Sequence, residues 1–185
     1  ALALSRKCNR PVKLVMSREE VFKGSGPTCS TSVDVKIGAT KDGIITAGEA
    51  TLRYQDGAFP ATWGMLGGMT AFACYDLENV KTVAYDVLVN RPKVAAYRAP
   101  SAPMAAFAVE STVDMVAHEI GMDPVDFRLK NCAKEGTRAS YGPTYGPIGI
   151  EATLKAVKNH PQMKAKLGQN QGRGMACGFW FNFGG

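Results

Sequence analysis

Apolar and polar residues alternate most regularly in the first third of the chain. Residues 33–37 read Val-Asp-Val-Lys-Ile, and this period of two predicts a strand with one buried face. Residues 41–43 read Lys-Asp-Gly, which is typical of a hairpin turn. Residues 44–54 then place Ile44, Ala50 and Leu52 on one face, with charged side chains opposite. The pattern predicts an antiparallel hairpin whose second face is open to water.

Three further stretches have the composition of strands. Residues 12–16 alternate weakly and predict a short buried strand. Residues 80–90 place Val83, Tyr85 and Val87 on one face of another strand, and residues 173–183 predict a last one. The Gly-rich stretch 56–69 lies between strand patterns, and we expect it to be a loop packed by its own side chains or one that covers a ligand.

Helical patterns occur mainly in the second half of the chain. Residues 104–121 carry a broad apolar stripe, which predicts a well-buried helix that ends at a glycine. Residues 123–132 begin with Asp-Pro, a typical helix start, and a third helix is expected over 150–160. In the first half, residues 17–24 begin with a serine cap followed by acidic residues and predict a short helix. Residues 1–7 have the composition of the last turns of a helix.

Length and composition fit one globular domain. The chain has 185 residues, of which 45% are apolar and 21% are charged. Strands in the first half and helices in the second favour an α+β fold, in which the hairpin and further strands pack against the helices. We expect residues 1–185 to form a single domain. Both ends read as cuts through secondary structure, so we expect the chain to be a fragment of a larger subunit.

Charge and cysteine content narrow the possible classes of function. The net charge is +6, but the densest basic clusters, 6–10 and 155–166, lack interleaved aromatic residues, which disfavours nucleic-acid binding. The five cysteines are widely spaced without a CxxC pair, so the sequence indicates neither a zinc site nor a disulfide framework. Free thiols are typical of a reducing compartment, and we expect a cytoplasmic location. Apolar runs are too short to span a membrane.

One stiff corner stands out between the strand pattern at 80–90 and the helix pattern at 104–121. Residues 97–103 read Tyr-Arg-Ala-Pro-Ser-Ala-Pro, and the two prolines fix φ and remove two backbone donors. The residues before the prolines, Ala99 and Ala102, are expected to be extended. Arg98 on such a corner suits recognition of an anionic, oxygen-rich group. A turn in which Arg98 binds local carbonyl groups explains the same residues equally well.

The sequence lacks the residue patterns of other common catalytic, metal-binding and phosphate-binding sites. His118 and His160 have no cysteine or carboxylate pair at metal-ligand spacing, so we expect no metal ligands in this chain. Ser101 and Ser111 have no visible histidine partner for nucleophilic catalysis. The glycines of 64–68 are not followed by the Lys-Ser/Thr of a phosphate-binding loop.

The corner also carries a family resemblance. Residues 96–103, Ala-Tyr-Arg-Ala-Pro-Ser-Ala-Pro, followed by 106–111, Ala-Phe-Ala-Val-Glu-Ser, resemble the molybdenum hydroxylase family of xanthine dehydrogenase, aldehyde oxidase and aerobic carbon monoxide dehydrogenase. Residues 123–131, Asp-Pro-Val-Asp-Phe-Arg-Leu-Lys-Asn, are similar to a second signature of that family. The resemblance covers nearly the whole chain and corresponds to the first molybdopterin-binding region of the large subunit.

The resemblance implies roles for five residues. Arg98 lies beside the molybdenum centre in such enzymes, and its neighbours Tyr97 and Ala99 are implied to bind the cofactor with it. Pro100 is implied to line the substrate pocket, at a position where xanthine dehydrogenases carry an aromatic residue. Thr28 stands where purine enzymes place a substrate-binding arginine, so purine specificity is not expected. Carbon monoxide dehydrogenases hold copper on a cysteine at the position of Ala99, so that chemistry is not expected either.

The implied activity belongs to the whole subunit. Such enzymes hydroxylate an aldehyde or heteroaromatic carbon with oxygen from water on a molybdenum–molybdopterin cofactor. Electrons leave through iron–sulfur clusters, with FAD as a further candidate, on partner subunits or domains. The catalytic glutamate of the family lies beyond this stretch, so we expect no catalytic residue here and no activity of the fragment alone. The alternative is a non-catalytic anion-binding or subunit-assembly module with the same fold.

Overall fold

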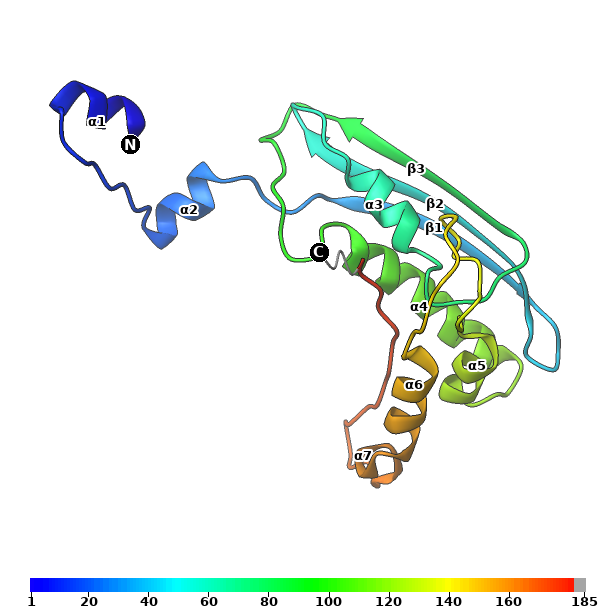
Figure 1. Cartoon of the computed structure of the whole chain (residues 1–185). Coiled ribbons are helices and arrows are strands. Elements are labelled where there is room, and N and C mark those ends of the chain that lie inside the picture. The colour runs from blue at the N-terminus through cyan, green and yellow to red at the C-terminus, as the bar shows by residue number, and fades with distance from the viewer. Residues whose placement is uncertain (182–185) are drawn as a thin grey trace.

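The computed structural model describes residues 1–181, and within that range the strands form one sheet (Figure 1). Its strands are β1 (Thr31–Ala39), β2 (Ile45–Gly57) and β3 (Val80–Leu88), in the order β1-β2-β3. The pair β1–β2 is antiparallel and the pair β2–β3 is parallel. This mixed sheet with helices confirms the α+β prediction.

The helices differ in how they contact this sheet. They are α1 (Leu2–Cys8), α2 (Arg18–Gly24), α3 (Trp63–Thr70), α4 (Ala102–Glu119), α5 (Pro124–Asn131), α6 (Ile150–Asn159) and α7 (Pro161–Lys164). The two helices α3 and α4 pack against each other and against the sheet, whereas α6 and α7 continue away from it (Figure 1). No helix in residues 1–181 is both long enough and apolar enough to cross a membrane.

The predicted hairpin is confirmed. Val33 pairs with Leu52 and Val35 with Ala50, and Ala50, Leu52 and Tyr54 are fully buried under the helices. The other face of the sheet carries exposed ion pairs, such as Arg53 Nη1 with Asp34 Oδ2 at 2.7 Å. Burial of alternate side chains therefore fixes the register, because a slip of one residue would turn the apolar set toward water.

The start of β2 differs in detail from the prediction. Ile44 was expected on the buried face, but it is 40% exposed, whereas Ile45 is buried. The register shifts between Gly38 and Ala39, where β1 meets the start of β2. Such an irregularity changes which residue faces the core.

Strand β3 is also confirmed, and its pairing with β2 shows which of its residues lie on the open face of the sheet and which lie on the inner face. Tyr85 lies opposite Arg53 and Val87 opposite Gln55, so this set belongs to the open face of the sheet. The inner face of β3 contacts α3, where Asp86 Oδ1 accepts a 2.7 Å hydrogen bond from the Gly64 backbone N–H. Asp86 thus supplies an acceptor to the start of a helix that has no cap of its own.

Three sequence predictions were wrong. Residues 12–16 form no strand, and residues 13–16 are exposed, because no other segment within residues 1–181 pairs with them. The second half of the expected 56–69 loop is the helix α3. Residues 173–181 run without strand pairing, and the rest of that predicted strand, 182–183, lies outside the described residues.

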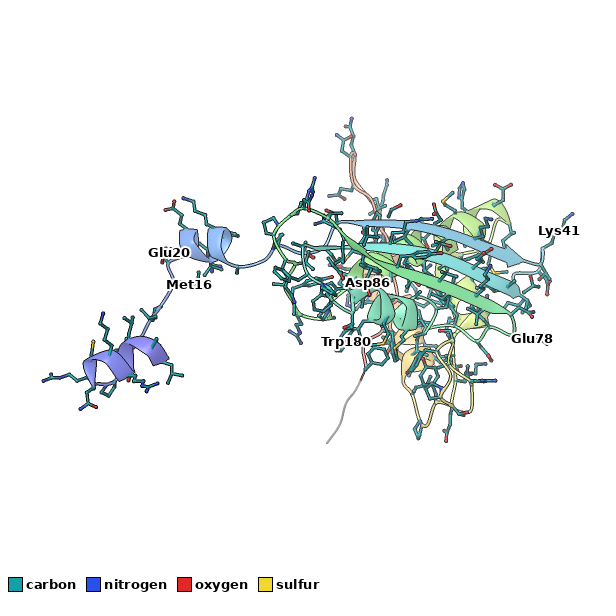
Figure 2. The ribbon with its side chains drawn as sticks, turned by 90° about the horizontal axis from the view of Figure 1, so that it is seen from above. Met16, Glu20, Lys41, Glu78, Asp86 and Trp180 are labelled. Carbon is teal, nitrogen blue, oxygen red and sulfur yellow. The ribbon has the colours of Figure 1, made fainter. Side chains whose placement is uncertain are left out.

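The first two helices form an arm that stands away from the body (Figures 1 and 2). Neither α1 nor α2 has a buried residue. Figure 2 shows Met16 and Glu20 on this arm and Lys41 at the far end of the sheet, in the hairpin turn. The short helix α2 is held locally, because Ser17 Oγ accepts from the Glu20 N–H and Glu20 Oε2 from the Ser17 N–H.

A buried charge cluster joins α4 to α5. The Arg128 side chain has no exposed surface; its Nε donates to Glu110 Oε2 at 2.8 Å and its Nη1 to Asp114 Oδ1 at 2.6 Å. Glu110 Oε1 also accepts a 2.5 Å hydrogen bond from the Tyr75 hydroxyl. The guanidinium and the Glu110 carboxylate therefore satisfy one another inside the core, as buried charges must.

The same signature ties α5 to the hairpin. Asp123 caps the helix by accepting from the backbone N–H groups of Val125 and Asp126 at 2.9 and 3.1 Å. At the other end, Asn131 Oδ1 accepts from the Ile45 N–H at 2.8 Å and its Nδ2 donates to the Gly43 carbonyl at 2.8 Å. The motif at 123–131 is therefore structural: it begins a helix and fastens both of its ends.

Candidate functional site: the corner before α4

The corner at residues 97–101 has an unusual backbone. Ala99 and Ser101 have φ angles of 56° and 66°, in the left-handed region that side chains other than glycine seldom adopt. The expectation that Ala99 is extended was therefore wrong, and Ala102 is the first residue of α4 rather than extended. The preference set by a following proline is overridden here by hydrogen bonds from the surrounding structure.

Ser101 is the centre of those hydrogen bonds. It is fully buried; its N–H donates to the Tyr97 hydroxyl at 2.8 Å, and its carbonyl accepts from the Tyr54 hydroxyl at 3.1 Å. Tyr54 in turn lies against α3 at Gly67, where a Cβ atom would stand 2.1 Å from the phenol oxygen. Burial raises the pKa of Tyr54, so the phenol stays a hydrogen-bond donor at neutral pH. A chain of contacts from α3 through β2 thus fixes the corner.

Replacing Tyr97 with Phe is expected to lower the free energy of unfolding by about 1–3 kcal/mol, because the buried Ser101 N–H loses its acceptor. Urea unfolding of the wild type and the variant measures the difference. Tyr85→Phe is the matched control, since Tyr85 is 51% exposed on the open face of the sheet. Equal stability of Tyr97→Phe and wild type would show that this hydrogen bond does not hold the corner.

Arg98 projects from this fixed backbone into solvent. The residue is exposed, and within residues 1–181 its guanidinium makes no hydrogen bond and no ion pair. The described structure therefore gives no support to the explanation in which Arg98 binds local carbonyl groups. An exposed guanidinium on a rigid backbone remains able to bind two oxygens of an anion at once.

Thr28 lies next to the corner although it precedes Tyr97 by 69 positions in the sequence. Burial raises the pKa of Tyr97, and hydrogen bonding with the Ser101 backbone and the Thr28 side chain opposes that rise. The segment before Thr28 is held beside the corner by the Ala95 N–H, which donates to the Pro27 carbonyl at 2.9 Å. The structure thus brings Thr28 together with residues 97–100.

A shallow groove adjoins the corner. It encloses about 280 Å³ and lies between the start of α4 and the segment that follows α7. Its lining residues are Ala99, Ala102, Pro103, Ala106, Gly178, Phe179 and Trp180. Sequence analysis did not place Trp180 here, because its aromatic neighbourhood was taken for part of a strand. Small side chains on the α4 side and aromatic ones opposite make this groove largely apolar.

Asp56 is a second residue that sequence analysis missed. It is fully buried near the end of β2; its Oδ2 accepts from the Ala61 N–H at 2.6 Å, while Oδ1 has no partner within the described residues. Burial raises the pKa of this carboxyl group, with the Asp86 carboxylate adding to the rise. Nothing in the sequence around Asp56 indicates that its side chain is buried, because only the fold removes this side chain from water.

The corner can hold one side of a large anionic cofactor. Arg98 offers a cation that has no partner within the described residues. Ala99 carries only a methyl group, so no large side chain projects beside Arg98. The backbone of both residues is fixed. Thr28 adds a hydroxyl group at the same place. These residues fit an oxygen-rich group such as a molybdopterin cofactor.

Comparison with known proteins gives an independent test of the resemblance. The chain is 29% identical over 159 residues to the nicotinate dehydrogenase large molybdopterin subunit of Eubacterium barkeri, covering 84% of this chain and 37% of that protein. It is 30% identical over 130 residues to the aldehyde oxidoreductase of Megalodesulfovibrio gigas, covering 69% of this chain and 14% of that protein. The chain thus spans well under half the length of these relatives.

Solved structures agree with the fold. The aldehyde oxidoreductase from Desulfovibrio gigas matches 75% of this chain and 16% of its own, with a TM-score of 0.69 and 26% identity. Quinoline 2-oxidoreductase from Pseudomonas putida 86 matches 88% of this chain and 22% of its own, with a TM-score of 0.75 and 22% identity, which bears on the fold alone. A family model, the molybdopterin cofactor-binding domain, matches residues 1–132. The chain therefore belongs to the molybdopterin cofactor-binding domain family.

Proposed function

We propose that the whole protein is a molybdopterin-dependent oxidoreductase in which residues 97–100 and Thr28 form one wall of the cofactor and substrate site. The observation that carries this proposal is the unpaired, exposed Arg98 on a backbone fixed by the buried Ser101. Nothing in the folding of residues 1–181 uses that guanidinium. A charged side chain held in place without an internal partner is suited to an external one.

Each residue of the wall has a distinct task in this proposal. Arg98 binds anionic oxygens of the cofactor through its planar fork. Ala99 lets the cofactor approach closely, and Tyr97 holds the turn through its hydrogen bond from the Ser101 N–H. Pro100 and Thr28 face the substrate. When bound, the cofactor supplies the two-electron chemistry by which a carbon atom is hydroxylated with oxygen from water.

The substrate class proposed is an aldehyde or a heteroaromatic ring. The names of the relatives support it: nicotinate dehydrogenase and aldehyde oxidoreductase. A threonine at position 28 offers one hydroxyl group and no charge, which disfavours substrates that need a cation there. The proposal includes further molybdopterin-binding domains and iron–sulfur or flavin partners, which would take the electrons. A cytoplasmic location stays a prediction.

The competing function is a non-catalytic assembly module. The observation that favours it is the arm, where Leu14, Met16 and Phe22 are 63, 50 and 78% exposed. Exposed apolar side chains in such numbers are typical of a surface that packs against another domain or subunit. An enzyme subunit also needs such contacts, so the arm alone does not decide between the two functions.

Substitution of Arg98 by Lys in the full-length protein tests the proposal. We expect kcat to fall about tenfold or more, equivalent to about 1.4 kcal/mol, since lysine keeps the charge but loses the planar fork. The melting temperature should stay close to that of the wild type, because the guanidinium has no partner in the described fold. Arg91→Lys is the matched control, as Arg91 is exposed in the same connecting segment.

Steady-state rates and thermal melts on the same preparations distinguish the outcomes. If Arg98→Lys lowers stability while turnover per folded molecule stays at the wild-type value, Arg98 is a structural residue and the proposed wall is misplaced. If both quantities are unchanged, the cofactor does not contact Arg98.

A further inference from the structure

Two cysteines far apart in the sequence meet in one cavity of the fold. Cys74 follows α3 and is 8% exposed, and Cys177 lies in the segment after α7 and is partly exposed. Both line a cavity of about 410 Å³ beside α6. Its other walls are mainly apolar side chains, including Ile150, Leu154 and Phe179. The cavity has room for a small molecule next to both sulfur atoms.

A single carboxylate fixes the backbone on both sides of this pair. Glu110 Oε2 accepts from the Cys177 backbone N–H at 2.7 Å, and Glu110 Oε1 accepts from the hydroxyl of Tyr75 at 2.5 Å. Tyr75 directly follows Cys74, whose carbonyl accepts from the Ala133 N–H at 2.9 Å. Both chain segments are anchored to α4 in this way, which holds the two cysteines at the wall of the same cavity.

The two thiols are not equivalent. The hydrogen bond from Cys74 is the largest cause that lowers the pKa of Cys177, and the buried Arg128 guanidinium lowers it further, whereas burial and Glu110 oppose these effects. The same thiol–thiol hydrogen bond and burial raise the pKa of Cys74. Cys177 is therefore the more acidic thiol of the two and the one expected to attack an oxidant.

We propose that Cys177 and Cys74 form an oxidisable dithiol site that reacts with a small hydroperoxide and closes to a disulfide. In the first step the Cys177 thiolate attacks a peroxide oxygen: an S–O bond forms, the O–O bond breaks, and the leaving oxygen takes a proton to depart as water or an alcohol. In the second step Cys74 sulfur attacks Cys177 sulfur: the S–S bond forms, the S–O bond breaks, and a second water leaves.

Atoms and electrons balance in this sequence. Two thiols lose two electrons and two protons in total, and the peroxide gains both. The site does not depend on the proposed cofactor chemistry, because neither cysteine belongs to the corner. Its product would link residue 74 to the segment that carries Trp180 beside Ala99, so oxidation would fasten one side of the groove at the corner.

The test uses the full-length protein, reduced and freed of reductant. Equimolar hydrogen peroxide is added, remaining thiols are alkylated, and peptides are mapped by mass spectrometry before and after reduction with dithiothreitol. We expect a reducible link between the peptides of Cys74 and Cys177. In a separate alkylation time course without peroxide, Cys177 should react about tenfold or more faster than Cys132, whose pKa burial raises.

Variants separate the two roles. Cys74→Ser should stop at a sulfenic acid on Cys177 that dimedone traps, and Cys177→Ser should leave Cys74 unmodified. Cys132→Ser is the control, since Cys132 is buried nearby and is expected to leave the link intact. Circular dichroism of each variant verifies that it is folded.

Three results would overturn the proposal. The first is oxidation of Cys177 to a sulfinic acid without any link to Cys74. The second is equal alkylation rates of Cys177 and Cys132. The third is no modification of either thiol in the folded wild-type protein. None of these results bears on Arg98 or on turnover. The proposed dithiol site and the proposed oxidoreductase function are therefore tested independently.

Discussion

Arg128→Met is expected to lower the free energy of unfolding by about 3–5 kcal/mol, a large part of the stability of a domain of this size. Arg128 has no exposed side-chain surface, and its guanidinium donates to Glu110, to Asp114 and to two backbone carbonyls. Methionine fills a similar volume but donates no hydrogen bond. The variant would leave the Glu110 carboxylate, 6% exposed, buried without its cation.

The cause can be tested in a second background. If the uncompensated charge of Glu110 dominates, then Arg128→Met should cost clearly less in a Glu110→Gln protein, because the amide carries no charge. Arg138→Met is the surface control, since Arg138 is exposed, and should change stability by no more than about 0.5 kcal/mol. Urea unfolding of the wild type, the three single variants and the double variant gives these differences. A cost for Arg128→Met near that of Arg138→Met would mean that the cluster contributes nothing to stability.

Gly67→Ala is expected to destabilise the chain by about 1–3 kcal/mol or more, although alanine is the better helix former. A Cβ atom at this position would lie 2.1 Å from the Tyr54 hydroxyl oxygen and 2.5 Å from the ring carbon that bears it. Tyr54 is fully buried in β2. Relief of the clash requires α3 to move away from the sheet or Tyr54 to lose its hydrogen bond to Ser101.

Gly68→Ala is the matched control in the same helix. Its Cβ would meet Thr82 Cγ2 at 3.3 Å and Ala84 Cβ at 3.5 Å, so a small adjustment of one methyl group is enough. We expect its stability to equal or exceed that of the wild type by up to about 1 kcal/mol. The comparison is made by denaturant unfolding, with near-ultraviolet circular dichroism to follow the environment of Tyr54. A stabilising Gly67→Ala would contradict the close contact between α3 and β2.

The sequence by itself determined the elements whose signals are local. Strict alternation at 33–37 and regular alternation at 49–54, with a turn between the two stretches, predicted the hairpin, because burial of one face needs that period. The cap at Asp123 and the serine cap at Ser17 predicted where α5 and α2 begin, because the hydrogen bonds involved lie within four residues. The signatures around Arg98 and at 123–131 were enough to predict the family, which the comparison confirmed.

The tertiary structure decided what depends on a partner. Residues 12–16 and 173–181 had strand-like composition but lack a neighbouring strand in the described fold, and a strand without one leaves its backbone groups unpaired. The helix α3 formed despite three glycines, because close packing on Tyr54 needs a residue without a side chain at Gly67. Local propensity alone predicted strands at 12–16 and 173–183 and a loop in place of α3.

The candidate site likewise combines features that the sequence predicts with features that only the fold determines. The prolines predicted that the chain is stiff near Arg98, but the left-handed Ala99 and Ser101 follow from hydrogen bonds to Tyr97 and Tyr54, which only the fold brings near. The nearness of Thr28 to Tyr97 was likewise beyond local pattern, and the cofactor and substrate roles of these residues stay predictions. A single domain over residues 1–185 also stays a prediction. Contacts between residues far apart in sequence leave no periodic signal, because each depends on the burial of both partners together.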